Sequence, residues 1–161
     1  MTIHADLPHY QAGNVIYHVT TSTFEGIKLD SPSRKIVYDS VLYFYNVRYD
    51  LYIFSVMPDH LHILLRPLMG ETGFYTLGEI MKSIKSFSAR KINEKRGLKG
   101  QVWNHDYFDR RIRGKEDYRA VWCYISENPV KECMVEHWMD YEFTWFKDKE
   151  KADKRTFVRY R

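Results

Sequence analysis

The sequence has very few cysteines and no long hydrophobic run. Only two of its 161 residues are cysteines, Cys123 and Cys133, which is too few for a disulfide framework or a four-cysteine zinc site. No apolar stretch approaches the roughly 18 residues that a membrane-spanning helix needs. The first residues lack a basic segment followed by an apolar one, so we expect no signal peptide. These absences predict a soluble, cytoplasmic protein of a reducing compartment.

The chain does contain enough apolar material for a core. Hydrophobic residues make up 44% of the sequence and aromatic residues 16%, which is typical of a folded chain rather than a disordered one. A chain of 161 residues has the size of one domain and needs no disulfide to fold. We therefore expect one domain over residues 1–146 and a basic C-terminal tail over residues 147–161.

The positive charge is concentrated in two segments. The net charge is +4, and the tail over residues 147–161 holds seven basic and three acidic residues, so the rest of the chain is neutral. Within that neutral part, residues 82–113 hold ten basic and three acidic residues, a local charge of +7. Such a segment can attract phosphate groups, although it can equally form an ordinary solvated helix face.

Hydrophobic periodicity predicts an α+β fold. Runs of β-branched and aromatic residues indicate strands over residues 15–24, 51–57, 60–66 and 107–113. Apolar residues at helical spacing indicate helices over residues 31–49, 77–96 and 115–128. The second and third strands should form an antiparallel hairpin around Pro58 and Asp59. The order of elements resembles the ferredoxin-like (RRM-like) arrangement, in which helices pack on one face of an antiparallel sheet.

His60 and His62 are the first candidates for a functional site. Residues two apart in a strand point to the same side, so both imidazoles would share one face while Leu61 points into the core. Two imidazoles on one face can bind a divalent metal with further ligands from elsewhere. The alternative is a pair of partly exposed histidines without a metal. Zinc is disfavoured because no cysteine or glutamate lies nearby at the usual spacing.

Tyr124 and Asn128 are the second candidates, and they would share one face of the predicted helix. A tyrosine beside a metal can act as a covalent nucleophile on phosphate, and the amide oxygen of Asn128 could be a third metal ligand. Each residue also has a simpler interpretation. Tyr124 is one of 13 tyrosines and could be an ordinary core residue. Asn128 could cap a new helix that starts at Pro129, because the residue before a proline avoids helical geometry.

Three sequence blocks occur in an order that resembles one known family. The blocks are MPDHLH at residues 57–62, VWN and YFDRRIR within residues 102–113, and YISENPVK at residues 124–131. Together they resemble the single-tyrosine HUH transposases, and in particular the REP-associated tyrosine transposases of bacteria. The resemblance covers roughly residues 15–146, which is nearly the whole chain.

The resemblance implies a metal-dependent endonuclease and strand transferase that acts on single-stranded DNA near hairpins. By position, His60 and His62 match the metal-binding histidines, and Asn128 matches the residue that completes the metal site. Tyr124 matches the nucleophile that forms a 5′-phosphotyrosine link and leaves a free 3′-OH. The resemblance further implies Mg²⁺ or Mn²⁺ as the metal and a single strand bearing a hairpin, such as a REP palindrome, as the DNA partner. Relatives act as dimers or as monomers, and we expect a monomer here.

Basic and aromatic residues between the histidine pair and Tyr124 are candidates for DNA contacts. Basic side chains position phosphates, and aromatic rings can stack on unpaired bases. The predicted DNA-binding residues are Lys82, Lys85, Arg90, Lys91, Trp103, Arg110, Arg111 and Arg113. Trp103 could equally be buried, and some relatives carry histidine where Arg110 stands.

Two other functions fit the same residues. One is a metal-dependent hydrolase in which the two histidines activate water and Tyr124 is structural. The other is a non-enzymatic module that binds single-stranded nucleic acid. The second is disfavoured because such modules usually carry aromatic residues on their central strands, where this chain has His60 and His62.

Overall fold

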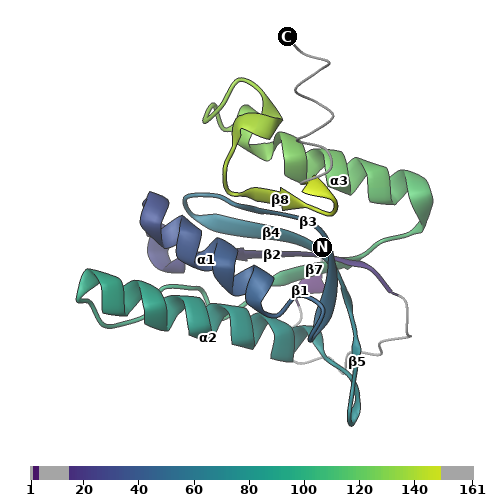
Figure 1. The fold of residues 1–161 in the computed structure, drawn as a ribbon, viewed down its shortest axis with the longest axis horizontal. Helices are drawn as coiled ribbons and strands as arrows, with labels where there is room; N and C mark the ends of the chain where they lie inside the picture. The colour runs from purple at the N-terminus through teal and green to yellow at the C-terminus, as the bar shows by residue number, and fades with distance from the viewer. Residues whose placement is uncertain (1, 4–14, 150–161) are drawn as a thin grey trace.

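A six-stranded antiparallel sheet forms the middle layer of the fold (Figure 1). The computed structural model describes residues 2–3 and 15–149, and the strand order in the sheet is β1-β7-β2-β4-β3-β8. The strands are β1 (Thr2–Ile3), β2 (Tyr17–Ser22), β3 (Tyr49–Val56), β4 (His60–Pro67), β7 (Phe108–Arg111) and β8 (Thr144–Phe146). A separate short hairpin is formed by β5 (Met69–Gly70) and β6 (Gly73–Phe74).

Helices cover both faces of this sheet. α1 (Ser31–Tyr43) and α2 (Leu77–Arg96) pack side by side on one face, and α3 (Gly114–Lys131) lies on the opposite face (Figure 1). The α+β class is therefore confirmed, and β2-α1-β3-β4-α2-β7 follows the expected β-α-β-β-α-β order. The expectation that all helices share one face is wrong, because α3 buries its own apolar stripe against the second face.

Alternation along β4 supplies the apolar side chains for both faces. Leu61, Ile63 and Leu65 are fully buried in the larger core, beneath α1 and α2. Leu64 is also fully buried, but it belongs to a smaller cluster that includes Ile125 of α3. Because successive strand residues point to opposite sides, the even-numbered residues of β4 face α3. The histidine pair lies in this even-numbered set.

The helix ends follow local sequence signals. The Thr76 hydroxyl accepts the Glu79 N–H, and the Glu79 carboxylate accepts the Thr76 N–H, so α2 begins with a complete capping box. α2 ends at Gly97, whose φ of 63° suits a residue without a side chain. α1 is capped by the carboxylate of Asp30, which accepts the Ser33 N–H at 2.9 Å.

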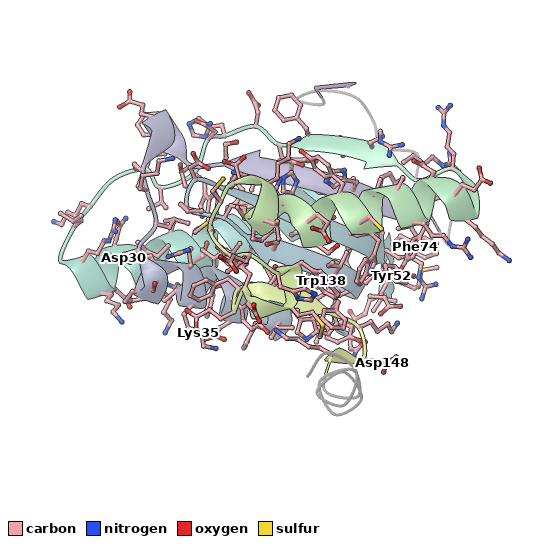
Figure 2. All side chains as sticks on the ribbon, turned by 90° about the horizontal axis from the view of Figure 1, so that it is seen from above. Asp30, Lys35, Tyr52, Phe74, Trp138 and Asp148 are labelled. Carbon is pink, nitrogen blue, oxygen red and sulfur yellow. The ribbon has the colours of Figure 1, made fainter. Side chains whose placement is uncertain are left out.

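The segment after α3 returns over the sheet and adds β8 to its edge. Figure 2 shows Trp138 in this segment, in the short helix η2 (Trp138–Asp140), on the same side of the sheet as α3. Its ring lies 5.5 Å from that of Trp122 and 5.4 Å from that of Phe146.

Of the predicted tail, only residues 147–149 are described, and the Lys147 ammonium lies 3.0 Å from the Asp50 carboxylate. The rest of the tail lies outside the described residues. Within the described ranges, no helix is both long and apolar enough to cross a membrane.

Truncating Ile125 is expected to weaken the docking of α3 on the sheet. Ile125 is fully buried, so Ile125→Ala removes buried apolar area and leaves a cavity. The expected loss in the free energy of unfolding is about 2–5 kcal/mol, measured by urea unfolding. Glu127→Ala changes an exposed residue of the same helix and should alter stability by no more than about 0.5 kcal/mol. Equal losses for the two variants would show that α3 is not held by this contact.

Candidate functional site

The pairing of β2 with β4 gathers three histidines on the face of the sheet that α3 covers. Thr20 lies opposite His62 and Ser22 opposite His60, and His18 shares the side of Thr20. The ring centroids of His60 and His62 are 4.8 Å apart, and those of His18 and His62 are 5.3 Å apart. The two predicted histidines therefore do share one face, and His18 joins them.

α3 brings Tyr124 and Asn128 to the same histidines. The Tyr124 ring packs edge-on against His62, with centroids 5.4 Å apart, and its side chain remains 46% exposed. Asn128 is only 4% exposed, and its Oδ1 lies 3.3 Å from the Nε2 of His60. Tyr124 is thus not an ordinary core tyrosine, and its ring borders both the histidines and solvent.

The helix continues through Pro129, and this continuation holds Asn128 in place. Pro129 lies in the last turn of α3, where its missing N–H removes only one hydrogen bond. The helix then closes with the Glu132 N–H donating to the Asn128 carbonyl at 3.0 Å. Asn128 therefore stays on the face of Tyr124, and the alternative of a new helix starting at Pro129 is wrong.

Asp59 orients the imidazole of His60. One Asp59 carboxylate oxygen lies 2.7 Å from the Nδ1 of His60, and the other accepts from the Lys28 ammonium at 2.6 Å. Both hydrogen bonds lower the pKa of the Asp59 carboxyl, and the one from Lys28 has the larger effect. A carboxylate at Nδ1 leaves Nε2 free to face Asn128, as in many metal sites where a second residue orients a histidine ligand.

His62 is oriented from the opposite side, by β2. Its Nδ1 lies 3.0 Å from the Thr20 hydroxyl and 3.2 Å from the Nε2 of His18. Burial, with smaller contributions from the nearby His18 and His60 rings, lowers the pKa of His62 to about 3. Burial, with a contribution from Arg110, lowers the pKa of His18 to about 4. Both rings are therefore neutral near pH 7, with lone pairs available as ligands or acceptors.

This arrangement offers a mixed nitrogen and oxygen donor set next to an exposed hydroxyl. In the part of the chain that the structure describes, no group of three or more histidine, cysteine, aspartate or glutamate residues could hold a metal ion. The candidate ligands are instead two imidazoles and one amide, from His60, His62 and Asn128. Such a set can bind a divalent cation only with help from water or substrate oxygens.

The four predicted DNA-binding residues of α2 lie on two different flanks of the helix. Lys82 and Lys85 line a pocket of about 310 Å³ between α2 and residues 100–107. Arg90 and Lys91 instead lie over the ring of Phe87, each 5.6 Å from its centroid. The four basic side chains are close in sequence, but they do not form one continuous surface.

Trp103 is placed where it cannot stack on a base. Its side chain is 3% exposed, and its Nε1–H donates to the Ser88 hydroxyl at 3.0 Å. The prediction that Trp103 contacts unpaired DNA is therefore wrong. A large apolar ring with a satisfied N–H gains more from burial in the core than from exposure.

The basic residues at the end of β7 lie close to the start of α3. Arg110 forms a two-pronged ion pair with Asp117, with nitrogen–oxygen distances of 2.9 and 2.8 Å. Arg111 and Arg113 are exposed. Arg111 also lines a hollow of about 460 Å³ together with Lys115 and Arg119 of α3. Local sequence patterns give no sign of this hollow, because it forms only where β7 meets α3.

Three further residues of the site were missed from the sequence, namely His18, Thr20 and Asp59. The alternation in residues 15–24 does predict that His18 and Thr20 share one face of a strand. It does not predict which strand lies next to it, and therefore gives no sign that this face meets the histidine pair. For Asp59, the sequence predicts only a place in the turn before β4.

Comparisons with known proteins give one matching family model and two aligned structures. Residues 14–128 match the family model described as IS200-like transposase. A structure of a REP-associated tyrosine transposase bound to a REP hairpin aligns with a TM-score of 0.71 and 19% sequence identity, covering 95% of this chain and 87% of that chain. A crystal structure of a candidate transposase from Deinococcus radiodurans aligns with a TM-score of 0.47 and 19% identity, covering 80% of this chain and 97% of that chain. No curated protein matches the chain.

Acidification is expected to destabilise the fold through the two buried histidines. The folded-state pKa values of His18 and His62 fall to about 4 and about 3 from an ordinary 6.5, so the unfolded chain binds protons that the folded chain does not. Their contribution to stability is therefore complete above about pH 6.5 and is lost as the pH falls toward the folded values. The loss is at most about 1.4 kcal/mol per pH unit for each group.

Urea unfolding near pH 7 and near pH 5, with a chelator present, measures this loss. The double variant His18→Gln/His62→Gln lacks both titrating rings, so its stability should change less between the two pH values. A wild-type protein and a double variant with the same pH dependence would contradict the prediction.

Proposed function

Because this chain belongs to the IS200-like transposase family, we propose that it is a metal-dependent endonuclease and strand transferase that cleaves single-stranded DNA near hairpins through Tyr124. The observation that carries this proposal is the packing of the half-exposed Tyr124 ring against His62. His60 and Asn128 meet beside this contact. A nucleophile open to solvent and a candidate metal site thus share one small area of the surface.

The proposed metal is Mg²⁺ or Mn²⁺, held by His60, His62 and Asn128. The Nε2 of His60 and the Oδ1 of Asn128 are 3.3 Å apart, close to the separation of about 3 Å expected for neighbouring octahedral ligands with bonds of about 2.1 Å. The Asp59 carboxylate accepts a hydrogen bond from the Nδ1 of His60, which is the usual support for a metal-binding imidazole. When bound, the metal would polarise a non-bridging oxygen of the scissile phosphate and offset its developing charge.

The proposed chemistry is a pair of phosphoryl transfers through Tyr124. The phenolic oxygen of Tyr124 attacks the phosphorus and loses its proton to solvent, while the bond from phosphorus to the 3′-oxygen breaks. The departing 3′-oxygen takes a proton from solvent, leaving a 5′-phosphotyrosine and a free 3′-OH. Attack by a 3′-OH on this phosphotyrosine rebuilds a phosphodiester and restores Tyr124, which completes strand transfer.

Basic side chains near Tyr124 can hold the DNA backbone during these steps. The Lys131 ammonium lies 5.9 Å from the centre of the Tyr124 ring, where it can face a phosphate. Arg111, with Lys115 and Arg119, lines the hollow beside the start of α3. We further assign weaker, position-setting phosphate contacts to Lys82, Lys85, Arg90, Lys91, Arg110 and Arg113. Arg110 would have to share its guanidinium with Asp117.

The proposed partner is a single DNA strand that carries a hairpin, and the proposed active form is a monomer. The hairpin is supported by the aligned transposase structure, which is bound to a REP hairpin. The monomer is supported by the contact between Tyr124 and His62 within one chain. A single chain can therefore supply both the nucleophile and the candidate metal ligands.

Tyr124→Phe is expected to abolish covalent attachment to DNA while leaving DNA binding nearly unchanged. The variant lacks the attacking oxygen but keeps the ring that packs on His62. The assay incubates protein with labelled hairpin oligonucleotides and Mg²⁺ or Mn²⁺, and follows the adduct on a denaturing gel. Tyr43→Phe makes the same change at an exposed residue of α1, so its adduct should form at the wild-type rate.

The same assay separates the two alternative functions. Cleavage that survives Tyr124→Phe would favour a hydrolase in which the histidines activate water. Tight binding without cleavage, over a panel of hairpins and divalent metals, would favour a non-enzymatic binding module.

Mixing two inactive variants tests whether Tyr124 acts within its own chain. Tyr124→Phe lacks the nucleophile and His62→Ala lacks a proposed metal ligand, so neither should form an adduct alone. If each site is built from one chain, the mixture should also be inactive. Recovery of adduct in the mixture would instead show that Tyr124 is supplied to a partner's site, and sedimentation of the wild-type protein would then show a dimer.

A further inference from the structure

A third imidazole, that of His18, lies on the Nδ1 side of His62. The proposed chemistry gives this ring no role. Its Nε2 is 3.2 Å from the Nδ1 of His62 and 3.4 Å from the Thr20 hydroxyl. We propose that His18 is a positioning residue, which fixes the tautomer and ring orientation of His62 so that the Nε2 of His62 can bind the metal. This inference rests on the metal-binding role proposed for His62.

The tautomer of His62 decides whether it can be a ligand at Nε2. A neutral imidazole carries one proton, and the ring nitrogen that binds a metal must be the one without it. Since Nδ1 of His62 faces Thr20 and His18, the proton must sit on Nδ1 to leave Nε2 free. A proton on Nε2 would block the proposed site.

Thr20 alone does not determine this choice. Its hydroxyl lies 3.0 Å from the Nδ1 of His62, and a hydroxyl can either donate or accept. If the hydroxyl donated to Nδ1, the proton of His62 would be forced onto Nε2. Thr20 therefore permits both tautomers of His62, only one of which can bind the metal.

In the proposed arrangement His18 carries its own proton on Nδ1, and its Nε2 then removes this ambiguity by serving as an acceptor. With its own proton on Nδ1, the Nε2 of His18 can only accept, either directly from the N–H of His62 or from the Thr20 hydroxyl. In the first case His62 already carries its proton on Nδ1. In the second case the hydroxyl proton points to His18, so the oxygen accepts from His62 instead. Both arrangements leave the Nε2 of His62 free.

The surroundings of His18 hold its ring in place for this task. Arg110 is its cross-strand neighbour on β7, and Arg110 is tied to Asp117 of α3 by two short contacts. The Tyr124 ring packs edge-on against His18, with centroids 6.1 Å apart. His18 is thus enclosed by β7, β4 and α3, the elements that carry the rest of the candidate site.

The tautomer can be measured directly in the metal-free protein by long-range ¹H–¹⁵N NMR of the histidine rings. In the wild-type protein, we expect the proton of His62 on Nδ1. His18→Phe removes the acceptor and should shift His62 toward the Nε2-protonated form. His18→Gln places an amide oxygen at a similar reach and should restore the wild-type tautomer. A wild-type His62 that carries its proton on Nε2 would overturn the proposal.

Mn²⁺ binding in the absence of DNA, followed by electron paramagnetic resonance, gives the second measurement. Loss of a residue that supports a metal ligand typically weakens metal binding about 10- to 100-fold, and we expect this loss for His18→Phe and recovery for His18→Gln. Thr20→Val is the matched control, because it removes the hydroxyl but keeps His18 as the acceptor, and it should bind Mn²⁺ nearly as the wild type does. An equal loss for Thr20→Val and His18→Phe would overturn the role of His18.

These measurements are separate from the test of the proposed function. Neither the tautomer nor Mn²⁺ affinity involves DNA or Tyr124, so a protein that forms no adduct could still show the expected His18 effects. Conversely, adduct formation that depends on Tyr124, together with an unchanged His62 tautomer in His18→Phe, would leave the function intact and reject the positioning role.

Discussion

The antiparallel pairing of β2 with β4 is the interaction on which the rest of the candidate site depends. It places Thr20 opposite His62 and Ser22 opposite His60, and it thereby brings His18 to the same group. Each strand also sends its alternate residues into the core beneath α1 and α2, as Leu61 does. A slip of one residue would exchange the two faces and bury the imidazoles in that core. The apolar residues of β4 therefore set the register that assembles the histidines.

The second requirement is a helix that packs tightly while leaving one side chain exposed. Val121 and Ile125 are buried against the sheet, and Tyr124 lies between them in sequence at the edge of the contact. Because the helix continues through Pro129, Asn128 stays one turn from Tyr124 and reaches His60. The same apolar stripe that anchors α3 thus fixes the distance between the proposed nucleophile and the proposed metal ligands.

The candidate site has neutral, buried histidines at its centre and basic side chains around it. Burial keeps the pKa values of His18 and His62 low, so these rings carry no charge near neutral pH. The basic side chains lie outside, along α2, at the end of β7 and on α3. In the proposed function, this arrangement keeps His62 deprotonated for metal binding while the surrounding cations can contact the DNA backbone.

The sequence by itself determined the element order, the shared face of His60 and His62 and the spacing of Tyr124 and Asn128. These features follow from local periodicity, which is written in neighbouring residues. Only the tertiary structure decided that α3 covers the opposite face, that Trp103 is buried, that Lys82 and Arg90 lie apart, and that His18 joins His62. Each of these depends on which elements become neighbours. That choice is made by packing and strand register between residues distant in sequence, about which local patterns carry no information.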